Sequence, residues 1–361
     1  MSEFKPGLEG VVAFETEIAE PDRDGGALRY RGVDIEELVG VVPFEKVWSL
    51  LVDGCPEPGL VPAEPYAAPG LTGDAPADAQ AVLAHLGGEW GLGQLIDVSD
   101  AQARNDLARL SATMISAVAQ SARVADGHSS TVDRETIDSG ETIAERFLLE
   151  WRGKADPTHV TALDTYWICT AEHGLNASTF CARIVASTGA DCAACLSSAV
   201  GALSGPLHGG APARVLPMLD AVAASGDAVG YVHDVLGRGD RLMGFGHRVY
   251  RAEDPRARLL RRTAKELGSP RYEVAEELEL VALAALREKS PDRPLETNVE
   301  FWSAVVLDVA EIPPQLAPAM FACSRTAGWS AHILEQKGLG RLVRPSARYV
   351  GPGARSLAAL V

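Results

Sequence analysis

The chain has 361 residues, 47% of them hydrophobic, which is enough for one large core or for two domains that share a cleft. Its 49 acidic residues outnumber its 33 lysines and arginines, so the formal net charge is −16. This charge argues against general nucleic-acid binding, because phosphate backbones need clustered positive surface. An anionic ligand would therefore need a local basic pocket.

The N-terminal residues lack the apolar core of a signal peptide, and no stretch reaches the roughly 18 apolar residues of a membrane span. We therefore expect a soluble, cytoplasmic protein. The six cysteines lie mostly in apolar runs, which favours buried free thiols. Cys192 and Cys195 have the spacing of a metal or redox motif, but no second pair accompanies them. No metal site is predicted.

Two patterns predict the secondary structure. Period-2 alternation at 11–18, and weakly at 27–31, predicts a small β-hairpin near the N-terminus. After Asp34, good helix formers dominate and apolar residues recur at three- and four-residue spacing, so the predicted fold class is all-α. Segments 55–77 and 121–138 are expected to be loops or short turns.

Two helix starts can be predicted from capping residues. Asp254 suits the N-cap of a helix that begins at Pro255 and stops at Gly268. A second helix should begin at Asn298 and stop before Pro313. This start places Glu300 in a first helical turn, where the helix dipole favours an ionised carboxylate.

Two histidines in glycine-rich turns, His208 and His247, indicate acid/base chemistry, because imidazole titrates near neutral pH. A carboxylate such as Glu300 can remove a proton beside a carbonyl if a neutral histidine hydrogen-bonds the developing enolate. Anionic substrate groups could be clamped by arginines. The candidates for that clamp are Arg256, Arg325 and Arg344.

Structural roles are the alternative for each of these residues. A single histidine is more often a structural hydrogen-bonding residue, and Glu300 could be only a carboxylate that stabilises a helix start. The arginines could be surface ion-pair partners.

Over nearly its whole length the chain resembles the citrate synthase family, in the shorter dimeric form found in many bacteria and archaea. Each shared motif is weak alone, but their order and spacing together are specific. The motifs are Leu28–Leu38, Glu172–Ser178, Gly205–Ala211, Gly244–Tyr250, Asp254–Arg256, Asn298–Glu300, Ser324–Arg325 and Arg344–Pro345.

The resemblance implies an all-α fold of two helical domains with a small N-terminal β-hairpin. Residues 1–209 and 313–361 would form the large domain and residues 210–312 the small one, with the active site in the cleft between them. The implied reaction, part of the tricarboxylic acid cycle, condenses acetyl-CoA with oxaloacetate and water to give citrate and CoA. It needs no metal and no cofactor, since the CoA thioester is a substrate.

The resemblance also implies a role for each candidate. His208 would hydrogen-bond the thioester oxygen, His247 would polarise the oxaloacetate carbonyl, and Glu300 would remove the methyl proton. Oxaloacetate would be bound by His173, Arg256, Arg325 and Arg344. In the family the last arginine reaches the neighbouring subunit's site, so a homodimer is implied.

Binding of CoA is expected at two places. The segment Met243, Gly244, Phe245 and Gly246 resembles the family's loop against the adenine ring. On the helix that follows, Arg258, Arg262 and Lys265 share one face by their spacing, and this face could hold the CoA phosphates. The alternative is a solvated basic face.

The chain departs from the family at Glu300, where aspartate is usual. The extra methylene moves the carboxylate by roughly 1 Å, which can cost on the order of 10²-fold in rate if nothing compensates, although backbone shifts could restore the reach. We therefore expect activity with altered kinetics. Three other functions stay open: a 2-methylcitrate synthase that uses propionyl-CoA, a citryl-CoA lyase, and a non-catalytic paralogue that binds CoA or a partner protein.

Overall fold

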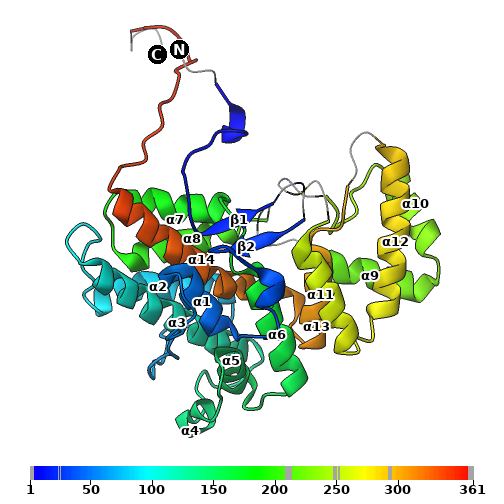
Figure 1. Ribbon diagram of the computed structural model, residues 1–361, viewed down its shortest axis with the longest axis horizontal. Helices are drawn as coiled ribbons and strands as arrows, with labels where there is room; N and C mark the ends of the chain where they lie inside the picture. Colours follow the sequence, from blue (N-terminus) through cyan, green and yellow to red (C-terminus); the bar gives the residue numbers. More distant parts are fainter. Residues whose placement is uncertain are drawn as a thin grey trace.

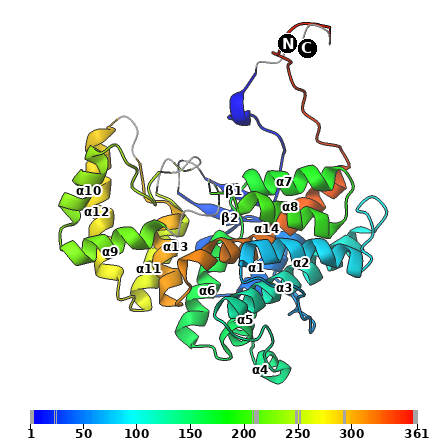
Figure 2. The same cartoon turned by 180° about the vertical axis from the view of Figure 1, so that it is seen from behind.

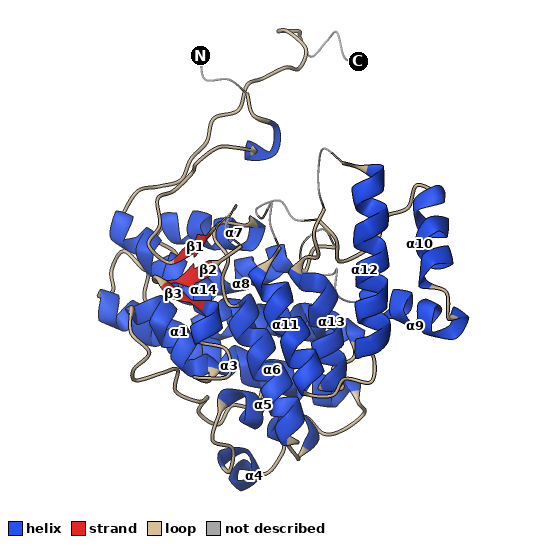
Figure 3. Cartoon of the chain, turned by 45° about the vertical axis from the view of Figure 1, so that its right-hand side comes forward, coloured by secondary structure: helices blue, strands red, loops and turns tan. Residues whose placement is uncertain are grey.

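The described residues form α-helices α1 to α14 and one small sheet, so the predicted all-α class is confirmed (Figure 3). The structure is a computed structural model that describes residues 4–22, 24, 26–206, 208, 214–246, 250, 253–291 and 295–356. Within these ranges, no helix is both long and apolar enough to span a membrane.

The sheet has three antiparallel strands in the order β1 (Ala19–Pro21), β2 (Leu28–Tyr30) and β3 (Val33–Asp34). A hairpin is therefore present, but the strand predicted at 11–18 is wrong, because pairing begins only at Ala19, opposite Tyr30. Residues 11–17 are mostly exposed, so their alternating side chains have no core to cover.

The largest group of helices packs around α14 (Ala317–Leu339), whose small residues let its neighbours approach closely. Gly328 shows how closely, since a Cβ there would lie 2.1 Å from the Glu172 carboxylate. The helices that pack against α14 are α1 (Phe44–Asp53), α2 (Ala75–Glu89), α3 (Asp100–Ala125), α6 (Pro157–Thr170), α7 (Ala177–Ser187) and α8 (Cys192–Leu203). In the same group, α5 (Ile143–Arg152) packs against α3, and α4 (Arg134–Asp138) packs against α5.

Three helices lie to one side of this group: α9 (Val215–Ser225), α10 (Ala228–Gly237) and α12 (Tyr272–Lys289) (Figures 1 and 2). They contact one another. Two further helices, α11 (Pro255–Glu266) and α13 (Val299–Val309), contact both each other and α6. The first turns of α11 and α13 therefore meet the helices around α14.

The two loop predictions differ in outcome. Of the segment 55–77, residues 55–74 contain no helix, as expected, but its last three residues belong to α2, which begins at Ala75. The prediction for 121–138 is wrong at both ends, because α3 continues to Ala125 and α4 covers Arg134–Asp138. Ala122 faces the core and Asp133 caps α4, so packing and capping extend helix into a polar segment.

The chain ends extend away from the helices side by side in all three views (Figures 1–3). Residues 340–356 contain no helix or strand, and Pro6–Leu8 forms a short 3-10 helix. The Arg348 guanidinium lies 5.7 Å from the centre of the Phe4 ring. Both segments expose large apolar side chains, among them Val12 and Tyr349.

Candidate functional site

A cavity of about 90 Å³ brings together four of the residues predicted for the site: His173, His208, Arg256 and Glu300. Its other lining residues are Tyr166, Thr170, Asn298, Val299, Ser303 and Phe321. The four come from segments far apart in the sequence. They meet because the C-terminal end of α6, the starts of α11 and α13 and the turn after α8 converge at one place.

His208 is held through its Nε2 atom by Ser178. The Ser178 Oγ lies 2.9 Å from Nε2, and the Ser178 amide donates to the same nitrogen at 3.4 Å. Because an amide can only donate, Nε2 is an acceptor and the ring hydrogen lies on Nδ1. Burial, helped by the charge of Arg325, lowers the pKa of His208 to about 4, so the ring is neutral at pH 7.

Ser178 is itself fixed by two neighbours. Trp329 Nε1 donates to its Oγ at 3.2 Å, and the single hydroxyl hydrogen is shared between two acceptors, Asn176 Oδ1 at 2.8 Å and His208 Nε2 at 2.9 Å. The Asn176 side chain also caps α7. Ser178 ends a motif noticed in the sequence, but its contact with His208 spans 30 positions and could not be predicted from local pattern.

Glu300 stands in the first turn of α13, as predicted, and its amide donates to the N-cap Asn298 Oδ1 at 3.0 Å. Burial raises the pKa of Glu300 to about 7; Arg256 opposes this shift and Asp254 adds to it. The first-turn position was expected to favour the ionised form of this carboxylate, but burial moves its pKa in the opposite direction, to near neutral pH. A carboxylate with this pKa suits a general base.

Arg256 and Asp254 form a fully buried, two-pronged ion pair. Arg256 Nε donates to Asp254 Oδ1 at 2.9 Å and Nη2 donates to Oδ2 at 2.7 Å. Burial alone would lower the pKa of Arg256, but the carboxylate of Asp254 outweighs it and raises the pKa. Asp254 is also the N-cap of α11, as predicted.

Arg325, on α14, is a fully buried cation beside the cavity. Its Nε donates to the Thr170 carbonyl at 2.6 Å, and its guanidinium lies 4.5 Å from the Phe321 ring centre. Among the described residues, neither of its Nη atoms has a hydrogen-bond partner. Leaving such donors unpaired is costly, so the arrangement favours an anionic ligand.

His173 is positioned by its neighbour Glu172. The fully buried Glu172 carboxylate accepts hydrogen bonds from the amides of His173 at 2.9 Å and Gly174 at 2.6 Å. His332 Nε2 lies 3.6 Å from the other carboxylate oxygen. Glu172 is therefore a buried partner of the loop that carries His173, and its burial was a feature that sequence reasoning missed.

The loop expected to contact CoA is tied to the start of α13. Gly246 donates to the Glu296 carbonyl at 2.7 Å, and the Asn298 amide donates to the Gly244 carbonyl at 2.9 Å. Gly244 has φ +87°, and a Cβ there would lie 2.7 Å from Phe301 Cβ. Phe245 pairs with Thr297 in an isolated bridge, while Met243 is half-buried.

The basic residues expected on α11 are only partly available to a ligand. Arg258 pairs with Glu36 and, at 3.4 Å, with Glu253. Arg262 and Lys265 are exposed. None of the three lines the cavity, so the CoA contacts stay a prediction.

Arg344 is exposed and does not line the cavity of this chain. It belongs to residues 340–356, which extend away from the helices (Figure 1). His247 lies outside the described residues. The six cysteines are free, and no group of three or more potential metal ligands occurs in the part of the chain that is described.

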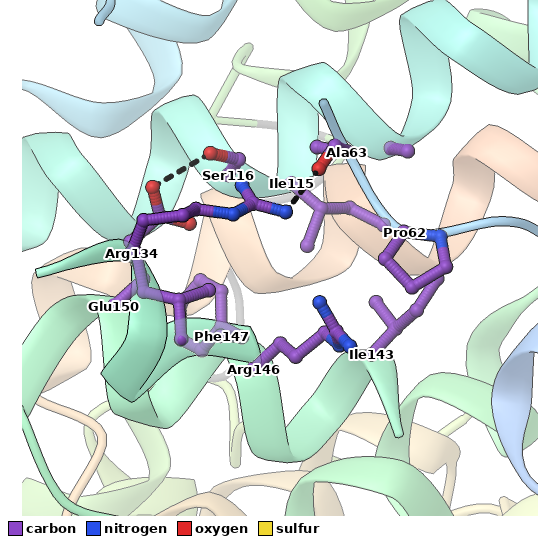
Figure 4. Close-up of a pocket in the computed structure, with 11 residues that line it drawn as sticks. Pro62, Ala63, Ile115, Ser116, Arg134, Ile143, Arg146, Phe147 and Glu150 are labelled. Atoms are coloured by element: carbon purple, nitrogen blue, oxygen red, sulfur yellow. Dashed lines mark hydrogen bonds between the residues drawn. The ribbon is translucent and has the colours of Figure 1, made fainter. Parts of the chain in front are cut away.

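Another small cavity lies among α3, α4 and α5 (Figure 4). Ser116 Oγ donates to Glu150 Oε1 at 2.7 Å, and Arg134 extends to the Ala63 carbonyl at 3.0 Å. Burial raises the pKa of Glu150 to about 7. The volume, about 30 Å³, leaves room for about one water, and none of the predicted site residues lines it.

Known proteins resemble the chain over almost all of its length. A family model described as "Citrate synthase, C-terminal domain" matches residues 7–60 and 73–346. A Mycobacterium bovis protein named "Putative citrate synthase 2" is 62% identical over 354 residues, which cover 98% of this chain and 94% of that protein. The 2-methylcitrate synthase of Shewanella oneidensis is 33% identical and covers 97% and 96%, respectively.

Solved structures agree with these relatives. The ternary complex of carboxymethyl coenzyme A and oxaloacetate with citrate synthase from Thermoplasma acidophilum has a TM-score of 0.83 at 27% identity, and the match covers 99% of this chain and 100% of that one. The family model, the sequence relatives and this structure all span the segments that form the cavity. The chain therefore belongs to the citrate synthase family.

Proposed function

We propose that the protein is a citrate synthase, an acyltransferase that condenses acetyl-CoA with oxaloacetate and water to give citrate and CoA. The observation that carries this proposal is the cavity in which Glu300, with a pKa of about 7, faces the same space as a neutral His208. One group can accept a proton from carbon while the other donates a hydrogen bond to the enolate.

Each step has a group suited to it. Glu300 removes a proton from the acetyl methyl group, and His208 stabilises the enolate oxygen through the hydrogen on Nδ1. The enolate carbon then attacks the oxaloacetate carbonyl. The family resemblance assigns the polarisation of this carbonyl to His247. Water finally hydrolyses the citryl-CoA thioester and releases CoA. We expect this reaction to need no metal and no cofactor, since the CoA thioester is a substrate.

Oxaloacetate is a dianion, and the cavity has two buried arginines for it. Arg256 lines the cavity and Arg325 lies behind Thr170 and Phe321, with both Nη atoms unpaired among the described residues. Guanidinium groups bind carboxylates by two parallel hydrogen bonds. His173 adds a polar group at the same cavity. The related Thermoplasma acidophilum enzyme binds oxaloacetate and a CoA analogue.

Domain closure fits this chemistry. We place the large domain at 1–209 and 313–361 and the small domain at 210–312, with the cavity between them. Glu300 and Arg256 then belong to the small domain and His173, His208 and Arg325 to the large one. Closure would bring the two sets together and exclude water until the carbon-carbon bond has formed.

A homodimer in which Arg344 completes the partner's site is part of the same proposal. Arg344 is exposed and does not line the cavity of its own chain, and residues 340–356 extend away from the helices (Figure 1). Residues 340–356 carry four arginines and no acidic residue in a chain of net charge −16, so the segment suits an acidic surface.

A 2-methylcitrate synthase is the second candidate, favoured by the Shewanella oneidensis relative. One methylene changes discrimination by only about 1–3 kcal/mol. The test is to mix the purified protein with oxaloacetate and either acetyl-CoA or propionyl-CoA, and to measure thiol release and the mass of the acid formed. We expect citrate and a higher kcat/KM for acetyl-CoA. Preference for propionyl-CoA would favour the second candidate, and no release with either would refute both.

A further inference from the structure

Asp254 joins the two helix starts that carry Arg256 and Glu300. Its Oδ1 accepts from the Arg256 amide at 3.0 Å and from Arg256 Nε at 2.9 Å. Its Oδ2 accepts from Arg256 Nη2 at 2.7 Å and from the amide of Val299 at 3.1 Å. Val299 precedes Glu300 in the chain. One carboxylate thus holds the arginine and the first residue of α13.

This arrangement does more than cap a helix. An N-cap needs one oxygen to accept one or two amides. Here both oxygens also contact the guanidinium, and the second oxygen reaches a different helix, 45 positions away. Asp254 is fully buried, so the carboxylate would be costly without such partners. A movement of α11 relative to α13 would break these bonds, which keeps Arg256 and Glu300 in register.

The same carboxylate sets the electrostatic surroundings of Glu300. Arg256 favours the ionised form of Glu300, and Asp254 disfavours it. Among the described residues, the other ionisable groups that line the cavity are His173, His208 and Tyr166, and Arg325 contacts the lining residue Phe321. Asp254 is paired with Arg256, the cation that acts on Glu300, so it offsets the positive charge that Glu300 would otherwise experience.

We propose that Asp254 is a positioning residue for the base: it locks Arg256 to the start of α13 and offsets the arginine's charge, so that Glu300 can still accept a proton. This inference rests on the proposed function, because it takes Glu300 to be the base. It concerns a residue that touches neither substrate.

The test titrates the Glu300 carboxyl directly, and therefore needs no turnover. Protein labelled with carbon-13 at the glutamate carboxyl carbon is titrated by NMR, and the Glu300 signal is identified by its loss in Glu300→Gln. Asp254→Asn removes the anion and leaves Arg256, so we expect the pKa of Glu300 to fall by roughly 1 pH unit from the wild-type value. Asp254→Ser, which keeps a capping oxygen, should give the same shift.

The matched control is Asp227→Asn, which removes a capping carboxylate from α10 outside the cavity and should leave the pKa of Glu300 unchanged. In the turnover assay, the acid limb of kcat/KM should move to lower pH in both Asp254 variants, and the KM for oxaloacetate should rise. An unchanged Glu300 titration in folded Asp254 variants would overturn the proposal, as would failure of both to fold. Absence of turnover in the wild type would refute the proposed function alone.

Discussion

Glu300 and His208 have pKa values that differ from those of the same side chains in water. Burial disfavours the charged form of both, so it raises the pKa of the carboxyl to about 7 and lowers that of the imidazole to about 4. At neutral pH the carboxyl is therefore poised to accept a proton, while the imidazole is a neutral hydrogen-bond donor. The sequence motifs suggested these two roles, whereas the pKa shifts that support them follow from burial in the fold.

The raised pKa of Glu300 predicts a pH-dependent gain in stability from Glu300→Gln. Between pH 4.5, the ordinary pKa of glutamate, and about pH 7, Glu300 is protonated in the folded protein but ionised in the unfolded chain. The free energy of unfolding therefore falls as pH rises through this window. Above pH 7, Glu300→Gln should stabilise the fold by up to ~3 kcal/mol. Denaturant unfolding at pH 8 and pH 4.5 checks this. An equal effect at both pH values would contradict it.

Ser178→Ala tests how His208 is held. The variant loses the hydroxyl that contacts Nε2, a hydrogen bond of about 1 kcal/mol, so kcat should fall about fivefold. The KM for oxaloacetate should stay unchanged, because Ser178 does not line the cavity. Ser139→Ala, an exposed serine, is the control. A raised KM with unchanged kcat would assign Ser178 to oxaloacetate binding instead.

At the scale of secondary-structure elements, the site is formed by the ends of helices. Arg256 and Glu300 both lie in first turns, each behind a capping side chain, and the turn that carries His208 follows α8. The loop 243–246 hydrogen-bonds to the residues just before α13. Its position is thereby coupled to that of Glu300, even though its proposed ligand is CoA.

Gly244→Ala should disturb this coupling. The added Cβ would lie 2.7 Å from Phe301 Cβ, one residue after Glu300, and φ is +87°. We expect kcat/KM to fall at least tenfold, since displacements of about 1 Å at the base are costly. Gly268→Ala is the matched control, because its φ is +67° but its Cβ would meet open space. If the two variants lose equal activity, backbone strain alone explains the effect.

The first residue of a helix could be predicted from the sequence where a single capping side chain determines it. Asp254 and Asn298 are strong N-caps, and both helices begin after them. The contacts of the site were not predictable, because they depend on tertiary packing: Trp329 reaches Ser178 across 151 positions. Burial likewise decides the protonation of Glu300, and local sequence does not encode it. The strand predicted at 11–18 failed for the same reason, since its alternation faces no core.

The whole molecule combines a strongly acidic chain with an arginine-bearing terminal segment. Residues 340–356 run beside the N-terminal segment, away from the helices (Figure 2). In the proposed homodimer this segment would lie against the acidic partner and carry Arg344 to its site. Each cavity would then need residues from two chains.

Mixing two inactive variants tests this arrangement. Arg344→Ala removes the arginine and Glu300→Gln removes the base, so each homodimer should be nearly inactive. If Arg344 acts across a two-fold interface, mixed dimers contain one intact site, and a 1:1 mixture refolded together should recover about a quarter of the wild-type activity. Separately refolded samples, combined afterwards, are the control. No recovery would place Arg344 in the site of its own chain.

Thiol release by the wild type, Glu300→Gln and Glu300→Asp, with oxaloacetate and acetyl-CoA, tests most directly whether Glu300 is the base. The wild type should release CoA, and Glu300→Gln should be at least ~100-fold slower because a neutral amide cannot accept the proton. Glu300→Asp should also be slower, by as much as ~100-fold, because the shorter side chain moves the carboxylate by roughly 1 Å from its position in the wild type. A wild-type rate in Glu300→Gln would contradict the account, and a wild-type rate in Glu300→Asp would contradict the claim that the longer side chain matters.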